Sequence, residues 1–266
     1  LSKGKVTLGS ITLTQDALLV YDKPTMIDYA QKNGIIVPET WRSVSKIKSF
    51  PCFYKQAYES GGGARGVARS PENIPLRERE NLIYQEIIDS PGTYGVGFIA
   101  KNGRLLVTHT HFERESIPKE GGSAVIIERY EDVRLIEKVK KLINSLNYSG
   151  WGLAEFKYCP KREDYIFMEI NAKFWASCEF AFRNEPLFLR YLFGIESKEN
   201  PTYRMIFLDS AFLRGLCFII KNRIFFEKNT SFRLYPNWSK RFIIGMIPNW
   251  TKRFLKNKNK YLIKNK

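Results

Sequence analysis

Apolar residues recur at helical spacing in the segment EDVRLIEKVKKLINSL, residues 131–146. Intervals of three and four residues place one set of side chains on the same face of a helix. This set comprises Val133, Ile136, Val139, Leu142 and Leu146. The pattern therefore predicts an amphipathic helix that packs this face against the rest of the protein.

A second helix is predicted over YDKPTMIDYAQKNG, residues 21–34. Asp22 suits its N-cap, Pro24 suits its first turn, and Gly34 suits the position just past its end. The segments IIVPETW, FPCFYKQA and LIYQEII follow as short apolar runs. Their length and composition predict β-strands.

Two β-hairpins are predicted further along the chain. TYGVGFIA and RLLVTHTHF flank Asn102-Gly103, which is a preferred two-residue hairpin turn. Residues 151–158 and 165–171 flank a turn rich in proline and charge. Helices and hairpins are thus mixed along the chain, which predicts the α+β class and not a parallel α/β fold.

The second hairpin brings two carboxylates together. A symmetric fold-back about Arg162 places Glu155 opposite Glu169, and Asn171 shares the strand face of Glu169. Like charges directly opposite each other destabilise a sheet, so the pair indicates a partner that neutralises it. The same register would pair Lys157 with Phe167 and Cys159 with Tyr165.

A divalent cation is the simplest such partner, because Mg²⁺ is bound by one or two carboxylates together with phosphates and water. Glu155, Glu169 and Asn171 would supply oxygen ligands from one face of two adjacent strands. Two alternatives stay open. The register differs by one residue, or Lys157 and Lys173 neutralise the pair at a solvated edge.

A glycine loop, YESGGGARGVARS, indicates a phosphate site. Gly61, Gly62 and Gly63 permit unusual backbone conformations and expose consecutive N–H groups, which hold phosphate oxygens. Lys55, just before the loop, would bring a cation to the same phosphates. The alternative is an ordinary surface loop. The segment is neither a P-loop nor a dinucleotide-binding GxGxxG motif.

These segments, in this order, resemble the ATP-grasp superfamily, and most closely its carboxylate ligases of the carbamoyl-phosphate-synthase type. DKPTMIDYAQKNGIIVPET resembles the opening of the ATP-binding region, and FYKQAYESGGGARGV the lysine and loop that close over the γ-phosphate. YQEIIDSPGTYGVGFIAKNG resembles the hinge that holds adenine. AEFK and FMEINAKFWAS resemble the two magnesium-binding strands. The resemblance runs from about residue 21 to residue 194.

The resemblance implies ATP and Mg²⁺, or Mn²⁺ as an alternative, as cofactors. It implies metal ligation by Glu155, Glu169 and Asn171. The residues implied to bind ATP are Lys23, Lys55, Gly61, Gly62, Gly63, Arg65, Gln85, Glu86, Ile87, Ile88 and Asp89. The residues implied to be catalytic are Lys55, Arg114 and Lys173.

Some positions depart from the family pattern. Asn171-Ala172-Lys173 stands where the family has Asn-Pro-Arg, and lysine lacks the bidentate fork of arginine. Thr93 replaces an acidic residue that often holds the ribose, so Glu86 or Asp89 is its substitute. His109 and His111 share a strand face without a third metal ligand, and are expected to be surface residues.

The resemblance implies an ATP-grasp fold with two α+β subdomains and the nucleotide between them. Residues 21–84 would form the smaller subdomain and 85–200 the larger, followed by a tail over 201–266. Residues 1–20 resemble only the linker from a missing N-terminal domain, so we expect a piece of a longer or processed protein. The implied reaction activates a carboxylate as an acylphosphate, which an amine or similar nucleophile captures.

Composition adds a second hypothesis. The net charge is +16, and residues 201–266 hold 15 Lys and Arg against two acids. The tail interleaves these cations with aromatics in two copies, PNWSKRF and PNWTKRF. Residues 236–266 thus suit an anionic membrane surface, a nucleic acid, or a merely solvated tail. The alternative function is such a binding module on an inactive ATP-grasp fragment.

Composition also bears on location. The four cysteines are scattered, and we see neither a signal peptide nor an apolar run long enough to span a membrane. We expect a reduced, cytoplasmic setting, with peripheral membrane attachment as an option.

Overall fold

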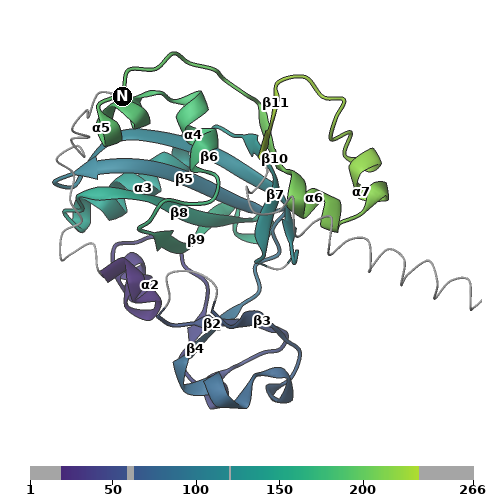
Figure 1. Ribbon diagram of the computed structural model, residues 1–266. Coiled ribbons are helices and arrows are strands. Elements are labelled where there is room, and N and C mark those ends of the chain that lie inside the picture. The colour runs from purple at the N-terminus through teal and green to yellow at the C-terminus, as the bar shows by residue number, and fades with distance from the viewer. Residues whose placement is uncertain (1–18, 59–62, 120, 234–266) are drawn as a thin grey trace, which may run out of the picture.

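The computed structural model describes residues 19–58, 63–119 and 121–233. Gly61, Gly62, most of the predicted linker and the aromatic repeats of the tail lie outside the described residues. Two β-sheets and several helices make up the described part, with the smaller sheet below the larger in Figure 1. The predicted α+β class is confirmed.

The smaller sheet is antiparallel and carries the segments predicted as strands before residue 90. Its strands, in order across the sheet, are β1 (Thr40–Trp41), β4 (Leu82–Glu86), β2 (Cys52–Gln56) and β3 (Arg65–Ala68). Short 3₁₀ helices η2 (Val44–Lys46), η3 (Pro71–Asn73) and η4 (Leu76–Asn81) accompany them.

The larger sheet has seven strands, antiparallel except for the parallel pair β10–β11. Their order is β11 (Thr230–Arg233), β10 (Arg204–Phe207), β7 (Ser123–Arg129), β6 (Arg104–Ile117), β5 (Thr93–Lys101), β8 (Gly150–Cys159) and β9 (Asp164–Asn171). The β5–β6 turn is confirmed, since Asn102 and Gly103 both have positive φ.

The remaining helices of the described residues accompany the larger sheet. They are η1 (Leu19–Tyr21), α2 (Lys23–Lys32), α3 (Val133–Ser145), η5 (Pro160–Arg162), α4 (Cys178–Asn184), α5 (Leu187–Phe193), α6 (Leu208–Leu213) and α7 (Leu216–Lys221). Among these residues, no helix is long and apolar enough to cross a membrane.

Both predicted helices form, and each begins at an aspartate cap. Asp22 accepts a hydrogen bond from the backbone N–H of Thr25, and Asp132 accepts one from that of Arg134. The predicted buried face of α3 is partly wrong, because Val133 is 67% exposed. Further apolar residues of α3 define a second face that overlaps the predicted one. The residues that are buried on this second face are Leu135, Val139, Leu142 and Ile143.

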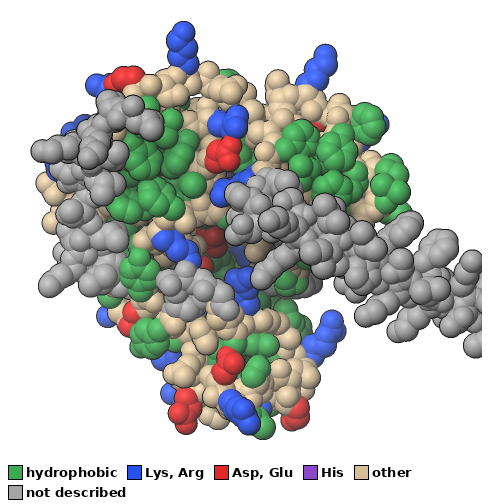
Figure 2. All heavy atoms as spheres, in the orientation of Figure 1, with side chains coloured by type: hydrophobic (Ala, Val, Ile, Leu, Met, Phe, Trp, Pro, Cys, Tyr) green, Lys and Arg blue, Asp and Glu red, His purple; other side chains and the backbone are tan. Residues whose placement is uncertain are grey.

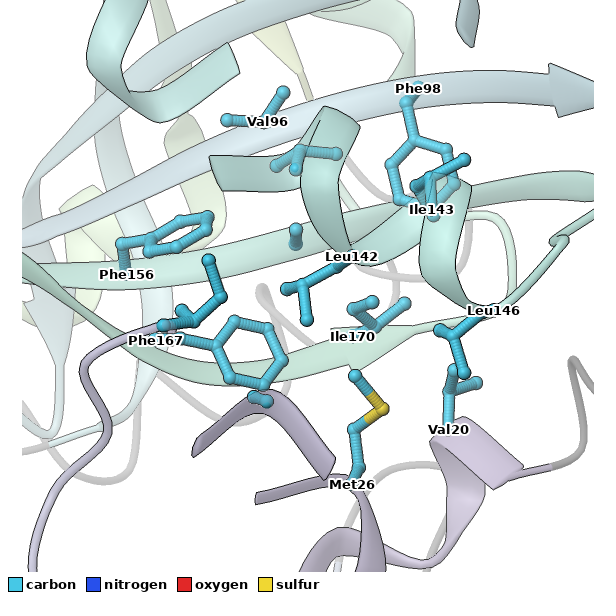
Figure 3. Packing of buried hydrophobic residues seen from close by; sticks show 14 of the residues in the cluster. Val20, Met26, Val96, Phe98, Leu142, Ile143, Leu146, Phe156, Phe167 and Ile170 are labelled. Carbon is cyan, nitrogen blue, oxygen red and sulfur yellow. The ribbon is translucent and has the colours of Figure 1, made fainter. Parts of the chain in front are cut away.

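One face of the large sheet is covered by α2 and α3, which share its main core (Figure 3). Met26 from α2 and Leu142 from α3 converge there on Phe156 and Phe167 of β8 and β9. The helix α2 therefore packs against the larger sheet, although its residues fall in the range predicted for the smaller subdomain.

The range predicted as a tail also contributes to the larger sheet. Met205, Ile206 and Phe207 on β10 are buried, and β10 pairs with β7. Because these apolar side chains complete the core at that edge, residues 204–233 are part of the sheet (Figure 1). A basic segment begins only after them.

The opposite face of the large sheet is covered in part by α4 and α5. Trp175, Ala181 and Phe188 pack there against Ile99 and Leu153 of the sheet. Beyond this cover, Lys55 of the smaller sheet contacts Met168 and Glu169 of β9. The polar residues described next lie around this contact.

Candidate active site

Glu155 on β8 lies directly opposite Glu169 on β9, as the sequence predicted. Nearer the turn the predicted register is wrong, because a bulge shifts the pairing so that Phe156 faces Phe167 and Lys157 faces Ile166. The bulge has a physical reason. It keeps the two phenylalanine rings together in the core while Glu169 stays on the opposite face of the sheet.

The two carboxyl groups differ in acidity. Burial, followed by the repulsion of Glu169 and Glu113, raises the pKa of Glu155 to about 8. Burial also opposes ionisation of Glu169, but Lys55, Lys23 and the amide of Asn171 outweigh it and lower its pKa. A proton therefore binds more readily to Glu155 than to Glu169.

Lys55 joins the two sheets at this point. Its Nζ atom donates to Glu169 Oε2 at 3.0 Å and to the backbone carbonyl of Met168 at 3.3 Å. Both side chains are largely buried, with 9% and 19% of their surface exposed. A lysine of the smaller sheet thus sits on the carboxylate pair of the larger one.

Lys23 and the start of the glycine loop lie beside Lys55. Lys23 is buried at the start of α2, and its backbone N–H donates to the carbonyl of Ala57 at the end of β2. Asp22 and Tyr58 form an isolated β-bridge next to it. Of the remaining loop residues predicted to bind ATP, Gly63 is half-buried and Arg65, opposite Lys55 on β3, is exposed.

Asn171 completes the carboxylate pair. Its Nδ2 atom donates to Glu169 Oε1 at 3.2 Å. Lys173 follows β9 and is half-buried. Figure 2 shows acidic and basic side chains gathered where the two sheets face each other.

His111 is a site residue that the sequence prediction missed. It is 1% exposed, and His109 is 8% exposed, so the expectation that both are surface residues is wrong. Both have the strand parity of buried Val107, which was the available signal. His109 packs against Phe180, and burial lowers its pKa to about 3.

The ring of His111 occupies the space above Gly95. A Cβ atom at Gly95 would lie 2.4 Å from its Cε1 atom. Gly95 pairs with His111 on one side and with Glu155 on the other, so His111, Gly95, Glu155 and Glu169 form one row across four strands. His111 Nε2 lies 3.8 Å from Glu113 Oε1 and has no hydrogen-bond partner among the described residues.

The segment between the sheets contains the predicted hinge. Ile88 is buried against Cys159 and Ile166, with Met168 beside them, and this apolar cluster lies next to Lys55. The Gln85 amide donates to Thr40. The remaining predicted hinge residues are Glu86, which accepts two hydrogen bonds from Arg162, and the exposed Ile87 and Asp89.

Arg114 contacts a different set of side chains. Its guanidinium lies 2.9 Å from Glu128 and donates to Asn222 at 3.2 Å. Arg204 binds the same glutamate. The bulge in β6 beside Glu113 turns Arg114 toward β7, which the sequence pattern did not reveal.

The donor set suits a hard cation. Among the described residues, no group of three or more His, Cys, Asp or Glu side chains is arranged to hold a metal. Glu155, Glu169 and Asn171 instead offer two carboxylates and an amide, which matches a magnesium site completed by phosphates and water. Burial and the neighbouring carboxylates raise the pKa of Glu155, and a bound cation would stabilise the charged form of this side chain.

No family model matches the sequence, and no curated protein matches it. Solved structures do resemble the fold. Biotin carboxylase from Campylobacter jejuni, in a β,γ-ATP complex, aligns with a TM-score of 0.58 at 16% identity, over 73% of this chain and 50% of that one. Carboxyaminoimidazole ribonucleotide synthase from Aspergillus clavatus, complexed with ATP, aligns with a TM-score of 0.55 at 13% identity, over 70% and 55%.

Pyruvate carboxylase from Rhizobium etli aligns with a TM-score of 0.54 at 12% identity, over 64% of this chain and 17% of that one. The chain thus spans about half the length of the first two proteins and less of the third. These similarities confirm the fold predicted from the sequence.

Proposed function

We propose that this chain, which has the ATP-grasp fold, binds ATP and a divalent cation between its two sheets and activates a carboxylate for ligation. One observation carries the proposal. Lys55 of the smaller sheet reaches the opposed pair Glu155 and Glu169 on the larger one. In such a site the carboxylates would hold the metal ion, and the lysine ammonium would contact the phosphates.

The nucleotide would lie along the segment that joins the sheets. We place the adenine at residues 85–89, on the apolar cluster of Ile88 and Ile166, and the phosphates at Lys23, Lys55 and the loop glycines. Asp89 is exposed, whereas Glu86 is already bound to Arg162, so we favour Asp89 for the ribose. The two similar structures solved with ATP or an analogue support a nucleotide at this fold.

Glu155, Glu169 and Asn171 would hold the cation, which we take to be Mg²⁺, with Mn²⁺ as a substitute. When bound, it would neutralise the phosphate oxygens during transfer. Lys55 would then exchange its contact with Glu169 for one with the phosphates. Proton loss from Glu155 would accompany metal binding, because a ligand must be ionised.

The proposed reaction has two steps. A substrate carboxylate oxygen attacks the γ-phosphorus of ATP, the bond to the β–γ bridging oxygen breaks, and ADP leaves. An amine (or similar nucleophile) then attacks the acyl carbon and displaces inorganic phosphate. Neither step needs a protein nucleophile; the lysines position the phosphates and stabilise the charge that spreads over them.

The residues beyond the metal are proposed for the substrate side. Lys173 would grip a carboxylate or phosphate, as its place after Asn171 suggests. His111 and Glu113 face the same region as Glu155. The catalytic role predicted for Arg114 stays a prediction, and it requires release of the guanidinium from Glu128. We place the enzyme in the cytoplasm, where its four free thiols stay reduced.

Release of ADP from ATP tests the proposal. The full-length protein would be supplied with MgATP and pools of carboxylates and amines, beside a Glu169→Gln variant. We expect ADP formation that requires both a carboxylate and Glu169. ADP release that is equal in the variant, or independent of every added carboxylate, would contradict the proposal. Binding to lipid or nucleic acid without any nucleotide binding would favour the inactive binding module.

A further inference from the structure

Exposed apolar side chains gather at one end of the large sheet, on α6, α7, the segment that leads to β11, β11 itself and the residue before β10. Figure 2 shows them as a group at the upper right, over the position of these helices in Figure 1. We call this group the α6–α7 patch. Its members are Tyr203, Leu213, Leu216, Ile220, Phe225, Phe226 and Phe232, each 43–83% exposed.

The residues that the structure describes leave the patch uncovered. Phe218 of α7 and Ile224 beyond its end pack with Ala211 of α6 against β7 and β10, while Leu216 and Ile220 of α7 are 70% and 63% exposed. The helix α7, LCFIIK, is thus apolar on both sides. A helix that is apolar all round is normally covered on both sides.

The charge around the patch selects the kind of partner. Lys221, Arg223 and Lys228 are exposed beside it. Of the two acids in residues 203–233, Asp209 is buried and Glu227 is bound to Arg204 at 2.9 Å. The surface is therefore cationic around an apolar centre.

The sequence that follows β11 is also basic. Residues 234–266 contain nine Lys and Arg and no acid. An anionic partner would attract both the cations beside the patch and those of residues 234–266.

We propose that the α6–α7 patch docks on the surface of an anionic lipid bilayer. Its phenylalanine and leucine side chains would enter the acyl boundary, while the lysines and arginines around them stay at the headgroups. A nucleic acid would satisfy the cations but would leave the aliphatic side chains of α7 in water. The bilayer satisfies both kinds of side chain.

Cys217 supplies a reporter within the patch. It is exposed on α7 next to Leu216, whereas Cys52 and Cys159 are buried. In a chain with Cys178→Ala, an environment-sensitive fluorophore on Cys217 would report its surroundings. We expect its emission to shift to the blue with phosphatidylglycerol vesicles and to stay unchanged with phosphatidylcholine vesicles.

A triple variant, Leu216→Ser, Ile220→Ser and Phe226→Ser, separates the patch from the basic segment, which stays intact in it. We expect vesicle co-sedimentation of the unlabelled full chain to weaken at least about tenfold at about 0.1 M salt, because apolar burial scales with the area lost. The matched control changes three apolar residues elsewhere that are also more than half exposed, Leu76→Ser, Val133→Ser and Ile195→Ser. Circular dichroism checks that both variants fold.

The proposal is overturned if the triple variant binds the anionic vesicles as tightly as the control. It is also overturned if the label on Cys217 does not shift while the chain co-sediments, since the basic segment alone would then hold the membrane. Equal binding to neutral vesicles, or binding only to RNA or DNA in a parallel gel shift, would overturn it as well.

Discussion

Lys55 Nζ lies 3.0 Å from Glu169 Oε2, and this contact connects the smaller sheet to the metal-type carboxylate pair of the larger one. The two residues are 114 positions apart in the sequence. In this pair the ammonium group of Lys55 neutralises the carboxylate of Glu169. In an ATP complex, a metal ion would neutralise this carboxylate instead. The proposed function depends on this contact being exchangeable.

Replacing Glu169 by Gln should abolish turnover and leave the fold intact. The change removes a charged ligand for the metal and the ion pair with Lys55, but it also removes the repulsion from Glu155. The ion pair is largely buried, so its loss outweighs the relieved repulsion, and we expect the free energy of unfolding to fall by roughly 3 kcal/mol. The measurements are ADP release and urea unfolding.

The matched control is Glu163→Gln, on the exposed turn of the same hairpin, which should keep full activity. A Glu169→Gln variant that retains activity within a few-fold would show that the metal assignment is wrong.

Metal-free protein should lose stability as the pH rises toward about 8. The pKa of Glu155 is higher in the folded than in the unfolded chain, so the folded state binds more protons in this window and its stability falls with pH. The lowered pKa of Glu169 acts in the opposite direction, but at lower pH. The lowered pKa of His109 raises stability up to about pH 6.5 in the wild type and in Glu155→Gln alike, so we expect the loss, on the order of 2 kcal/mol between about pH 5 and about pH 9, relative to that variant.

Thermal unfolding across this pH range checks the expectation, with Glu155→Gln as the variant that should flatten the profile. Added Mg²⁺ should raise the melting temperature more at the alkaline end, because the ionised carboxylate is the ligand. A wild-type profile as flat as that of the variant would contradict the shifted acidity of Glu155.

Replacing Lys55 by Met should weaken ATP binding by at least about tenfold, since it removes a phosphate-facing cation. It should also raise the pKa of Glu169, because Lys55 is its main stabilising charge. Lys161→Met, at an exposed position of η5, is the control and should bind as the wild type does. Fluorescence titration with a labelled ATP analogue would measure the affinity of both variants. Equal affinities would show that Lys55 does not bind the phosphates.

Gly95→Ala should destabilise the fold by about 1–3 kcal/mol, because the added methyl group would clash with the His111 ring. The double variant Gly95→Ala, His111→Ala should recover most of that loss, since the alanine methyl enters the vacated space. Denaturant unfolding of both single variants and the double variant gives the coupling free energy between positions 95 and 111. Additive effects would show that His111 does not lie over Gly95 in solution.

The features that local sequence determines were predicted correctly. Asp22 caps its helix, Asn102-Gly103 forms the hairpin turn, and Glu155 faces Glu169. Each depends on residues close in sequence, or on a hairpin whose turn sets the register. The resemblance to a known fold supplied the order of the segments around them.

What the sequence did not reveal depends on contacts between distant segments. The burial of His111 follows from the missing side chain at Gly95 on the next strand. The side on which Arg114 points follows from a bulge and from Glu128 on β7. Strand parity with Val107 does indicate the buried face for His111, but neither its contact with Gly95 nor the side on which Arg114 points leaves a pattern within one strand.

Calorimetric titration with a non-hydrolysable ATP analogue, with and without Mg²⁺, tests the central claim most directly. The folded wild-type chain should bind the analogue in the presence of Mg²⁺, with binding strongly weakened when the metal is chelated. No detectable heat at about millimolar analogue, where even weak sites fill, would contradict the account.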